Sequence, residues 1–206
     1  MMATAADKTM RNGGFSLIEV LIVIAITTIG FLALVNLQIG TLRGVGTSRS
    51  MMQAVNLSEH FIETLKSEGL PWTGDASILT SQPTTFPHLR LAGSPTEGGG
   101  SGWVRAYQST NSDSRVGPLG IVESDNWDAG AAMEISPERE RRFCVHYRLT
   151  WVVPNYLIRA DVRTLWMRDE SNVGLYQDCP VGMETDLANV ASVTIPGTVM
   201  RNVFAQ

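Results

Sequence analysis

The chain has 206 residues, of which 44% are hydrophobic and 17% are charged, and its formal net charge is −4. This length is typical of one domain with appendages, and the slight negative charge excludes a global field that attracts nucleic acid or anionic lipid. Two cysteines are too few for a disulfide-rich scaffold and too isolated for a structural zinc site.

The first 14 residues form a short polar segment ahead of a long apolar run. Lys8 and Arg11 lie in this segment, and the 23 residues from Val20 to Leu42 include no Asp, Glu, Lys, Arg or His. As a helix, such a run is about 35 Å long, enough to cross roughly 30 Å of bilayer hydrocarbon, and it exceeds the apolar core of an ordinary secretory signal. The pattern predicts a leader over residues 1–14 and one membrane span whose N-terminus faces the cytoplasm.

One acidic residue, Glu19, lies near the start of the apolar stretch that begins at Phe15. A carboxylate at mid-bilayer costs about 2.5–3.5 kcal/mol, and less near an end of the span. By itself, an interfacial acid that reaches the headgroups explains Glu19 as well as a functional partner does. The sequence around it, GGFSLIEV over residues 13–20, resembles the prepilin processing motif of the type IV pilin-like family.

The resemblance assigns a role to each of three residues. It implies that a prepilin peptidase cleaves after Gly14, that Phe15 becomes the N-methylated N-terminal residue, and that Glu19 pairs with the N-terminal amine of a neighbouring subunit. This pairing is physically coherent, because an amine and a carboxylate in an apolar lattice each need an opposite charge. The continuation over residues 30–43 is similar to that of PilV-like minor pilins.

Residues 15–42 are expected to be the membrane and filament-core half of a spine helix, and residues 43–68 its amphipathic half. Apolar residues recur there at three- and four-residue steps, as in a helix that covers a sheet. Gly69 and Pro71 form a stop signal, so one near-continuous helix of about 80 Å is expected. Glycines inside it leave open local melting, kinks or close helix packing. The apolar positions are Met51, Ala54, Val55, Leu57, Phe61, Ile62 and Leu65, and the glycines are Gly30, Gly40, Gly44 and Gly46.

Residues 69–206 are predicted to form a globular domain outside the membrane. Segment 92–102 is rich in glycine and predicts an exposed flexible loop. Residues 143–151 and 156–167 alternate apolar with more polar side chains around a turn and predict a β-hairpin. The fold class is therefore α+β, a long N-terminal hydrophobic spine helix packed on a C-terminal antiparallel β-sheet, as the resemblance also implies. Weaker strand candidates are residues 103–107, 119–122 and 190–204.

The domain shows no pattern typical of catalysis or metal binding. His60, His88 and His146 are far apart in sequence, and no paired ligand spacing, nucleophile elbow or phosphate-binding loop is present. The sequence therefore predicts a protein that is not an enzyme and has no catalytic residue, metal or cofactor. Cys144 and Cys179 are the candidates for one disulfide, because the predicted topology places them in an oxidising compartment.

Two other patterns have a functional and a structural interpretation. Arg139, Arg141, Arg142 and Arg148 could form a basic strip for DNA or an acidic partner, but Glu138 and Glu140 interleave with them and favour solvated ion pairs. The tryptophans could form a carbohydrate or adhesion platform, but core and rim packing is favoured. The five are Trp72, Trp103, Trp127, Trp151 and Trp166.

Three functions compete. The favoured one is a minor pilin that helps initiate, prime or cap a type IV pilus, with adhesion and motility as consequences of the pilus. The others are a minor pseudopilin of a type II secretion system and a membrane-anchored periplasmic enzyme or binding module. The resemblance implies an inner-membrane protein that moves into the periplasm and the tip of an extracellular pilus. The partners it implies are major and minor pilins, the prepilin peptidase and the inner-membrane assembly platform, and not nucleic acid.

Overall fold

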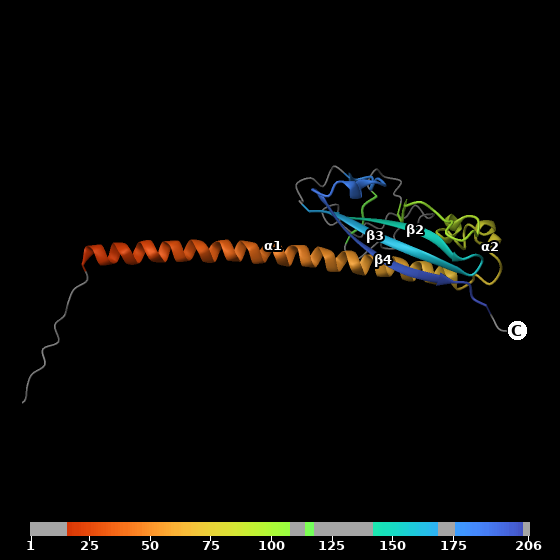
Figure 1. Ribbon diagram of the computed structural model, residues 1–206, viewed down its shortest axis with the longest axis horizontal. Coiled ribbons are helices and arrows are strands. Elements are labelled where there is room, and N and C mark those ends of the chain that lie inside the picture. The colour runs from red at the N-terminus through yellow and green to blue at the C-terminus, as the bar shows by residue number, and fades with distance from the viewer. Residues whose placement is uncertain (1–15, 108–113, 118–141, 169–175, 204–206) are drawn as a thin grey trace, which may run out of the picture. The chain divides into compact units, whose positions relative to one another are not determined.

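The computed structural model describes residues 16–107, 114–117, 142–168 and 176–203. Its helices are α1 (Leu17–Gly69) and α2 (Ser77–Ser81), with 3-10 helices η1 (Leu89–Ala92) and η4 (Met183–Thr185) (Figure 1). Its strands are β1 (Val104–Arg105), β2 (Phe143–Val153), β3 (Leu157–Met167) and β4 (Val190–Met200). The chain forms two compact units, Met1–Gly46 and Thr47–Gln206.

The first unit contains the N-terminal part of α1. The helix is uninterrupted at Gly30 and Gly40, and its end at Gly69 confirms the stop predicted there. An 18-residue window of α1 has a mean hydropathy of 2.6, which makes the helix long and apolar enough to cross a membrane. Thr27 and Thr28 donate their hydroxyl hydrogens to backbone carbonyls one turn earlier. These two hydroxyls therefore need no polar partner outside the helix.

The second unit is built on a four-stranded antiparallel sheet with the order β1-β2-β3-β4. Strands β2 and β3 form a hairpin whose turn includes Asn155 in the left-handed conformation, with φ 60°. The predicted hairpin is therefore confirmed, as are strands within residues 103–107 and 190–204. The strand candidate at residues 119–122 lies outside the described residues.

One face of the sheet packs against the part of α1 from Thr47 to Gly69 (Figure 1). Gly197 of β4 makes this approach possible, because a Cβ there would lie 2.7 Å from a methyl carbon of Ile62. Ser58 is buried in the same layer and hydrogen-bonds Thr164 of β3 at 2.8 Å. The predicted apolar stripe is correct except for Met51, which is 53% exposed, and Val55, which is half-buried and not part of the core. The helix contributes Ala54, Leu57, Phe61, Ile62 and Leu65 to the core, and β2 contributes Phe143, Val145, Tyr147, Leu149 and Trp151.

The end of α1 is joined to the segment that follows it by a buried carboxylate. Glu68 accepts hydrogen bonds from the backbone N–H groups of His88 and Leu89, and its other oxygen contacts the His88 ring. This contact holds η1 against the helix. Trp72 and Trp151 pack edge to face nearby, with ring centroids 5.7 Å apart.

The tryptophans follow the core prediction in part. Trp72, Trp151 and Trp166 are buried, which confirms their place in the core. Trp103 is half-buried on the other face of the sheet, and position 127 lies outside the described residues.

The glycine-rich segment differs from its prediction as a flexible loop. Gly98 donates its N–H to the carbonyl of Trp151 at 2.9 Å, and Ser101 donates to that of Leu149 at 3.0 Å. Gly100 lies so close to β2 that a Cβ there would be 2.0 Å from the Leu149 carbonyl oxygen. Residues 98–101 therefore extend the edge of the sheet, and the expectation of flexibility is wrong for them.

Candidate functional site

The start of α1 places the carboxylate of Glu19 in the first helical turn. The Glu19 N–H donates to the Ser16 side-chain oxygen at 3.3 Å and to the Ser16 carbonyl at 3.0 Å. A serine three positions before a glutamate is the capping-box pattern, and the helix dipole favours an acid in this turn. Ser16 was not among the predicted site residues, although this spacing ahead of an apolar run is itself a helix-start signal. The residues at positions 14 and 15 lie outside the described part of the chain.

The side chains beside Glu19 and along the helix after it form an exposed apolar surface. The Leu17–Gly69 window with the highest hydropathy has none of its residues buried. Contiguous apolar surface of this size marks a site of contact with membrane or protein. The exposed apolar residues include Leu17, Ile18, Leu21, Ile24, Phe31 and Leu37.

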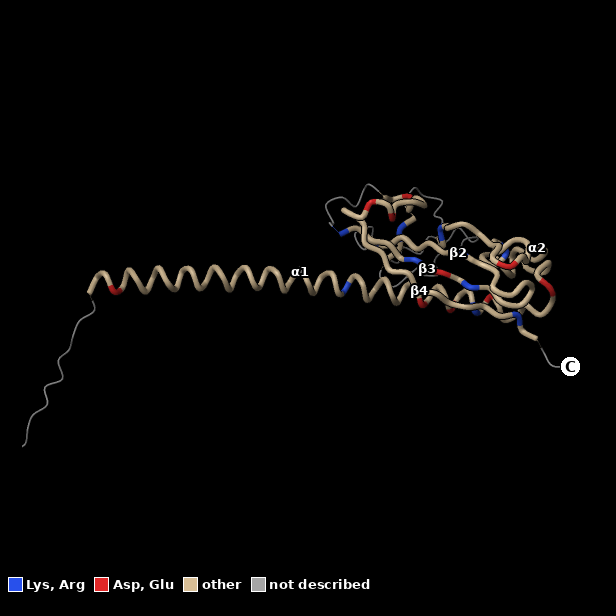
Figure 2. Tube along the Cα trace, in the orientation of Figure 1, with Lys and Arg blue, Asp and Glu red and all other residues tan. Residues whose placement is uncertain are grey.

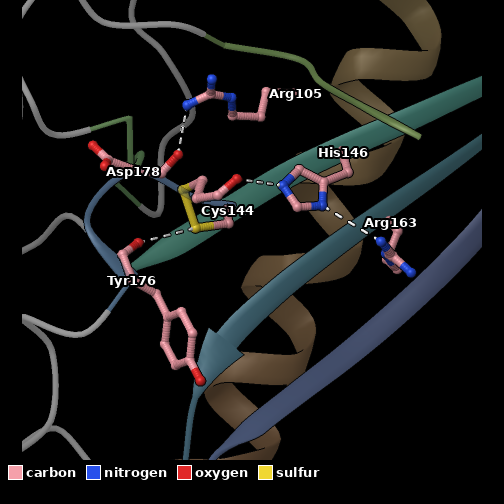
Figure 3. Close-up of a disulfide and its surroundings, with 7 residues drawn as sticks. Arg105, Cys144, His146, Arg163, Tyr176 and Asp178 are labelled. Atoms are coloured by element: carbon pink, nitrogen blue, oxygen red, sulfur yellow. Dashed lines mark hydrogen bonds between the residues drawn. A yellow bond between two sulfur atoms is a disulfide. The ribbon is translucent and has the colours of Figure 1, made fainter. Parts of the chain in front are cut away.

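A disulfide lies on the sheet face opposite α1. Cys144 of β2 and Cys179 are bonded, with Cα atoms 5.4 Å apart, and both are buried (Figure 3). The bond attaches the segment ahead of η4 to the sheet. Around it, Leu165, Met183 and Val190 complete a small second core.

His146 lies beside this disulfide, and both of its ring nitrogens have polar neighbours. Its Nε2 donates to the Cys179 carbonyl at 2.9 Å, and its Nδ1 faces a terminal nitrogen of Arg163 at 3.5 Å (Figure 3). Burial lowers the pKa of His146, Arg163 lowers it further, and the Cys179 carbonyl acts in the opposite direction. His146 therefore stays neutral at neutral pH and anchors the disulfide segment.

The same face carries an array of charges on β2 and β3. Arg148 and Arg159 each donate to the carboxylate of Asp161 at 2.8 Å. Arg163 Nη2 forms an ion pair with Glu184 Oε2 at 3.1 Å, and burial lowers the pKa of Arg163 while Glu184 opposes that shift. Basic and acidic residues alternate along this face of β3, in the order Arg159, Asp161 and Arg163 (Figure 2).

The predicted basic strip is changed by this pairing. Arg148 pairs across the hairpin with Asp161, its register partner. Asp161 was not among the predicted partners of Arg148, although the pairing register counted outward from the hairpin turn places the two residues opposite each other. Positions 138–141 lie outside the described residues, and Arg142, which directly precedes β2, is exposed.

The histidines do not come together in a site. His88 contacts Glu68, and His146 contacts Cys179. Across the described ranges, no group of three or more His, Cys, Asp or Glu side chains could hold a metal ion.

Residues 9–35 match the family model of the prokaryotic N-terminal methylation motif. This range contains positions 14 and 15, the capping pair Ser16 and Glu19, and most of the exposed apolar helix. No curated protein and no solved structure matches the chain. The motif supports a membrane-anchored protein of the type IV pilin or pseudopilin kind, and the long apolar helix with its C-terminal antiparallel sheet is consistent with an α+β pilin fold.

Proposed function

We propose that this chain is a type IV pilin-like structural subunit that is processed at its N-terminus and assembles through its apolar helix. The observation that carries the proposal is the methylation motif over residues 9–35, which continues into a helix whose apolar side chains are exposed. Such a helix is stable in a membrane or when packed against similar helices, and not in water. The subunit acts by assembly, and no catalytic role is assigned to it.

The proposed order of events rests on the charges at the N-terminus of the chain. The helix first anchors the chain in the inner membrane, with the second unit on the outer side. Cleavage after Gly14 leaves a cationic amine on Phe15, which the family methylates. In the filament this amine lies among apolar helices, and the Glu19 carboxylate of a neighbouring subunit balances its charge.

Processing provides the direct test of this proposal. We expect intact-mass and N-terminal peptide mass spectrometry of the mature protein to show a chain that begins at a methylated Phe15. Gly14→Val should abolish cleavage in cells that contain the peptidase, because the branched side chain blocks the scissile bond. Gly13→Ala is the matched control and should be processed. A mature chain that retains Met1, or is cut within residues 25–45, contradicts the proposal.

The finer proposal is that the subunit is a minor pilin that helps initiate, prime or cap a type IV pilus. It is supported by the resemblance of residues 30–43 to PilV-like minor pilins. A minor pseudopilin of a type II secretion system shares the same N-terminal physics and is the alternative. The proposed partners are other pilins and the inner-membrane assembly platform, and the proposed final location is the pilus, at its tip.

Deletion of the gene separates these alternatives. We expect fewer surface pili on the deletion strain with unchanged protein secretion, and recovery of other pilins in pull-downs with the full-length protein. Complementation with the wild-type gene is the control. Loss of secretion with normal piliation supports the pseudopilin, and normal piliation, normal secretion and no pilin partner contradict both.

A further inference from the structure

A polar groove of about 520 Å³ lies on the sheet face opposite α1, toward the hairpin end of β2 and β3. Its volume is within the range of small-molecule sites, roughly 300–1,000 Å³. The glycine-rich segment 98–102 and Trp103 form one side. Side chains of the hairpin form the other, with Arg148, Thr150, Arg159 and Asp161.

Asp161 organises the charges of this groove. Its side chain is only 4% exposed, and its two oxygens accept from Arg148 Nη2 and Arg159 Nε, both at 2.8 Å. Two guanidinium groups therefore share one carboxylate, and the lining retains one positive charge. The arginine side chains are 43% and 54% exposed, so this charge faces solvent.

The arginines keep hydrogen-bond donors that the described residues do not use. Arg148 Nε is buried and has no partner there. The described part of the chain also provides no partner for the terminal nitrogens of Arg159, whose Nε alone contacts Asp161. The Arg159 side chain is 54% exposed, so its terminal nitrogens can bind a carboxylate through two parallel hydrogen bonds, and the cationic head of Arg148 adds an attractive charge.

The rest of the lining suits a ligand that carries hydroxyl groups. Ser101 accepts from the Leu149 N–H at 2.9 Å, which leaves its own O–H free to donate. Segment 98–102 offers backbone with little side chain, so a ligand can approach the sheet edge. Trp103 holds Arg148 in place, with the guanidinium 5.0 Å from the ring centroid.

We propose that this groove binds a monovalent sugar acid, with the ligand carboxylate on Arg159 and Arg148 and its hydroxyl groups on segment 98–102 and Thr150. A single negative charge neutralises the one positive charge left by Asp161, whereas a doubly charged phosphate exceeds it. The proposal depends on the second unit alone and stands apart from the proposed function.

Isothermal titration calorimetry of the mature protein in neutral detergent provides the test. The probes are D-glucuronate, D-glucose, acetate and inorganic phosphate. We expect glucuronate to bind at least tenfold more tightly than each of the others. Arg159→Gln should weaken glucuronate binding at least tenfold. Gly102→Glu should do the same, because it adds a carboxylate at a position where a Cβ meets no atom within 4 Å.

Arg90→Gln is the matched control, since Arg90 is an exposed arginine on η1 outside the groove. It should bind glucuronate like the wild type, and thermal unfolding should show that all variants are folded. Equal affinities for acetate and glucuronate overturn the proposal that the groove recognises the sugar hydroxyl groups. A higher affinity for phosphate than for glucuronate overturns the proposal that it selects a singly charged ligand. Absence of glucuronate binding, or wild-type affinity in both groove variants, overturns the site.

Discussion

Replacing Glu19 with glutamine is expected to lower the recovery of the subunit in sheared filaments by tenfold or more without changing its insertion into the membrane. Breaking a buried ion pair by removing one partner costs about 3–5 kcal/mol, and each 1.4 kcal/mol is about a factor of ten in an equilibrium. Glutamine keeps the shape of the side chain and can still complete a capping box. The substitution therefore removes the charge alone.

Ser16→Ala is the complementary variant. It removes the side-chain acceptor of the Glu19 N–H and keeps the carboxylate. Loss of an N-cap costs about 0.5–2 kcal/mol of helix stability, which a membrane-embedded helix tolerates. Quantitative immunoblots of sheared filaments and of membrane fractions compare both variants with wild type. Equal incorporation of Glu19→Gln and wild type contradicts the pairing role, and a loss confined to Ser16→Ala shows that Glu19 serves the helix cap.

Removal of the disulfide is expected to lower the free energy of unfolding by about 3–4 kcal/mol. The bond closes a loop with a sequence separation of 35 residues, and in the chain-entropy model a loop of this size contributes that amount. The double variant Cys144→Ala/Cys179→Ala tests this by denaturant unfolding of the mature protein in detergent. We also expect faster amide hydrogen exchange in residues 176–190, because the disulfide attaches this segment to β2.

Reduction of the wild-type protein is the matched control for packing. It breaks the same bond and leaves both sulfur atoms in the small core with Leu165 and Met183. Reduced wild type and the alanine variant should therefore lose similar stability, apart from the packing lost with the sulfurs. Thiol titration of the denatured, unreduced mature protein should find no free thiol. Two free thiols, or equal stability with and without reductant, contradict this prediction.

Local sequence patterns were sufficient for the long helix and the β-hairpin, but they predicted none of the short helices α2, η1 and η4. The end of α1 at Gly69 follows from glycine and proline chemistry, and the β2–β3 hairpin follows from alternation around a turn. The long apolar helix was readable because hydrophobicity over many residues is a strong signal. The sequence alone showed that an acid at position 19 is unusual in an apolar stretch. The resemblance to the prepilin motif explained it as a partner for an N-terminal amine.

Contacts between distant residues were decided only by the tertiary structure. Ser58 hydrogen-bonds Thr164 across 106 positions, and Glu68 binds the backbone at His88 and Leu89, so polar residues of an amphipathic helix became buried. Segment 98–101 lies along the edge of β2 because glycine permits close backbone approach. Its glycine-rich composition alone had suggested a flexible loop. Asp161 gathers two arginines because strand register places Arg148 opposite it. Periodicity records which side of an element faces the core, whereas the partner on that side depends on register and packing between elements far apart in the chain.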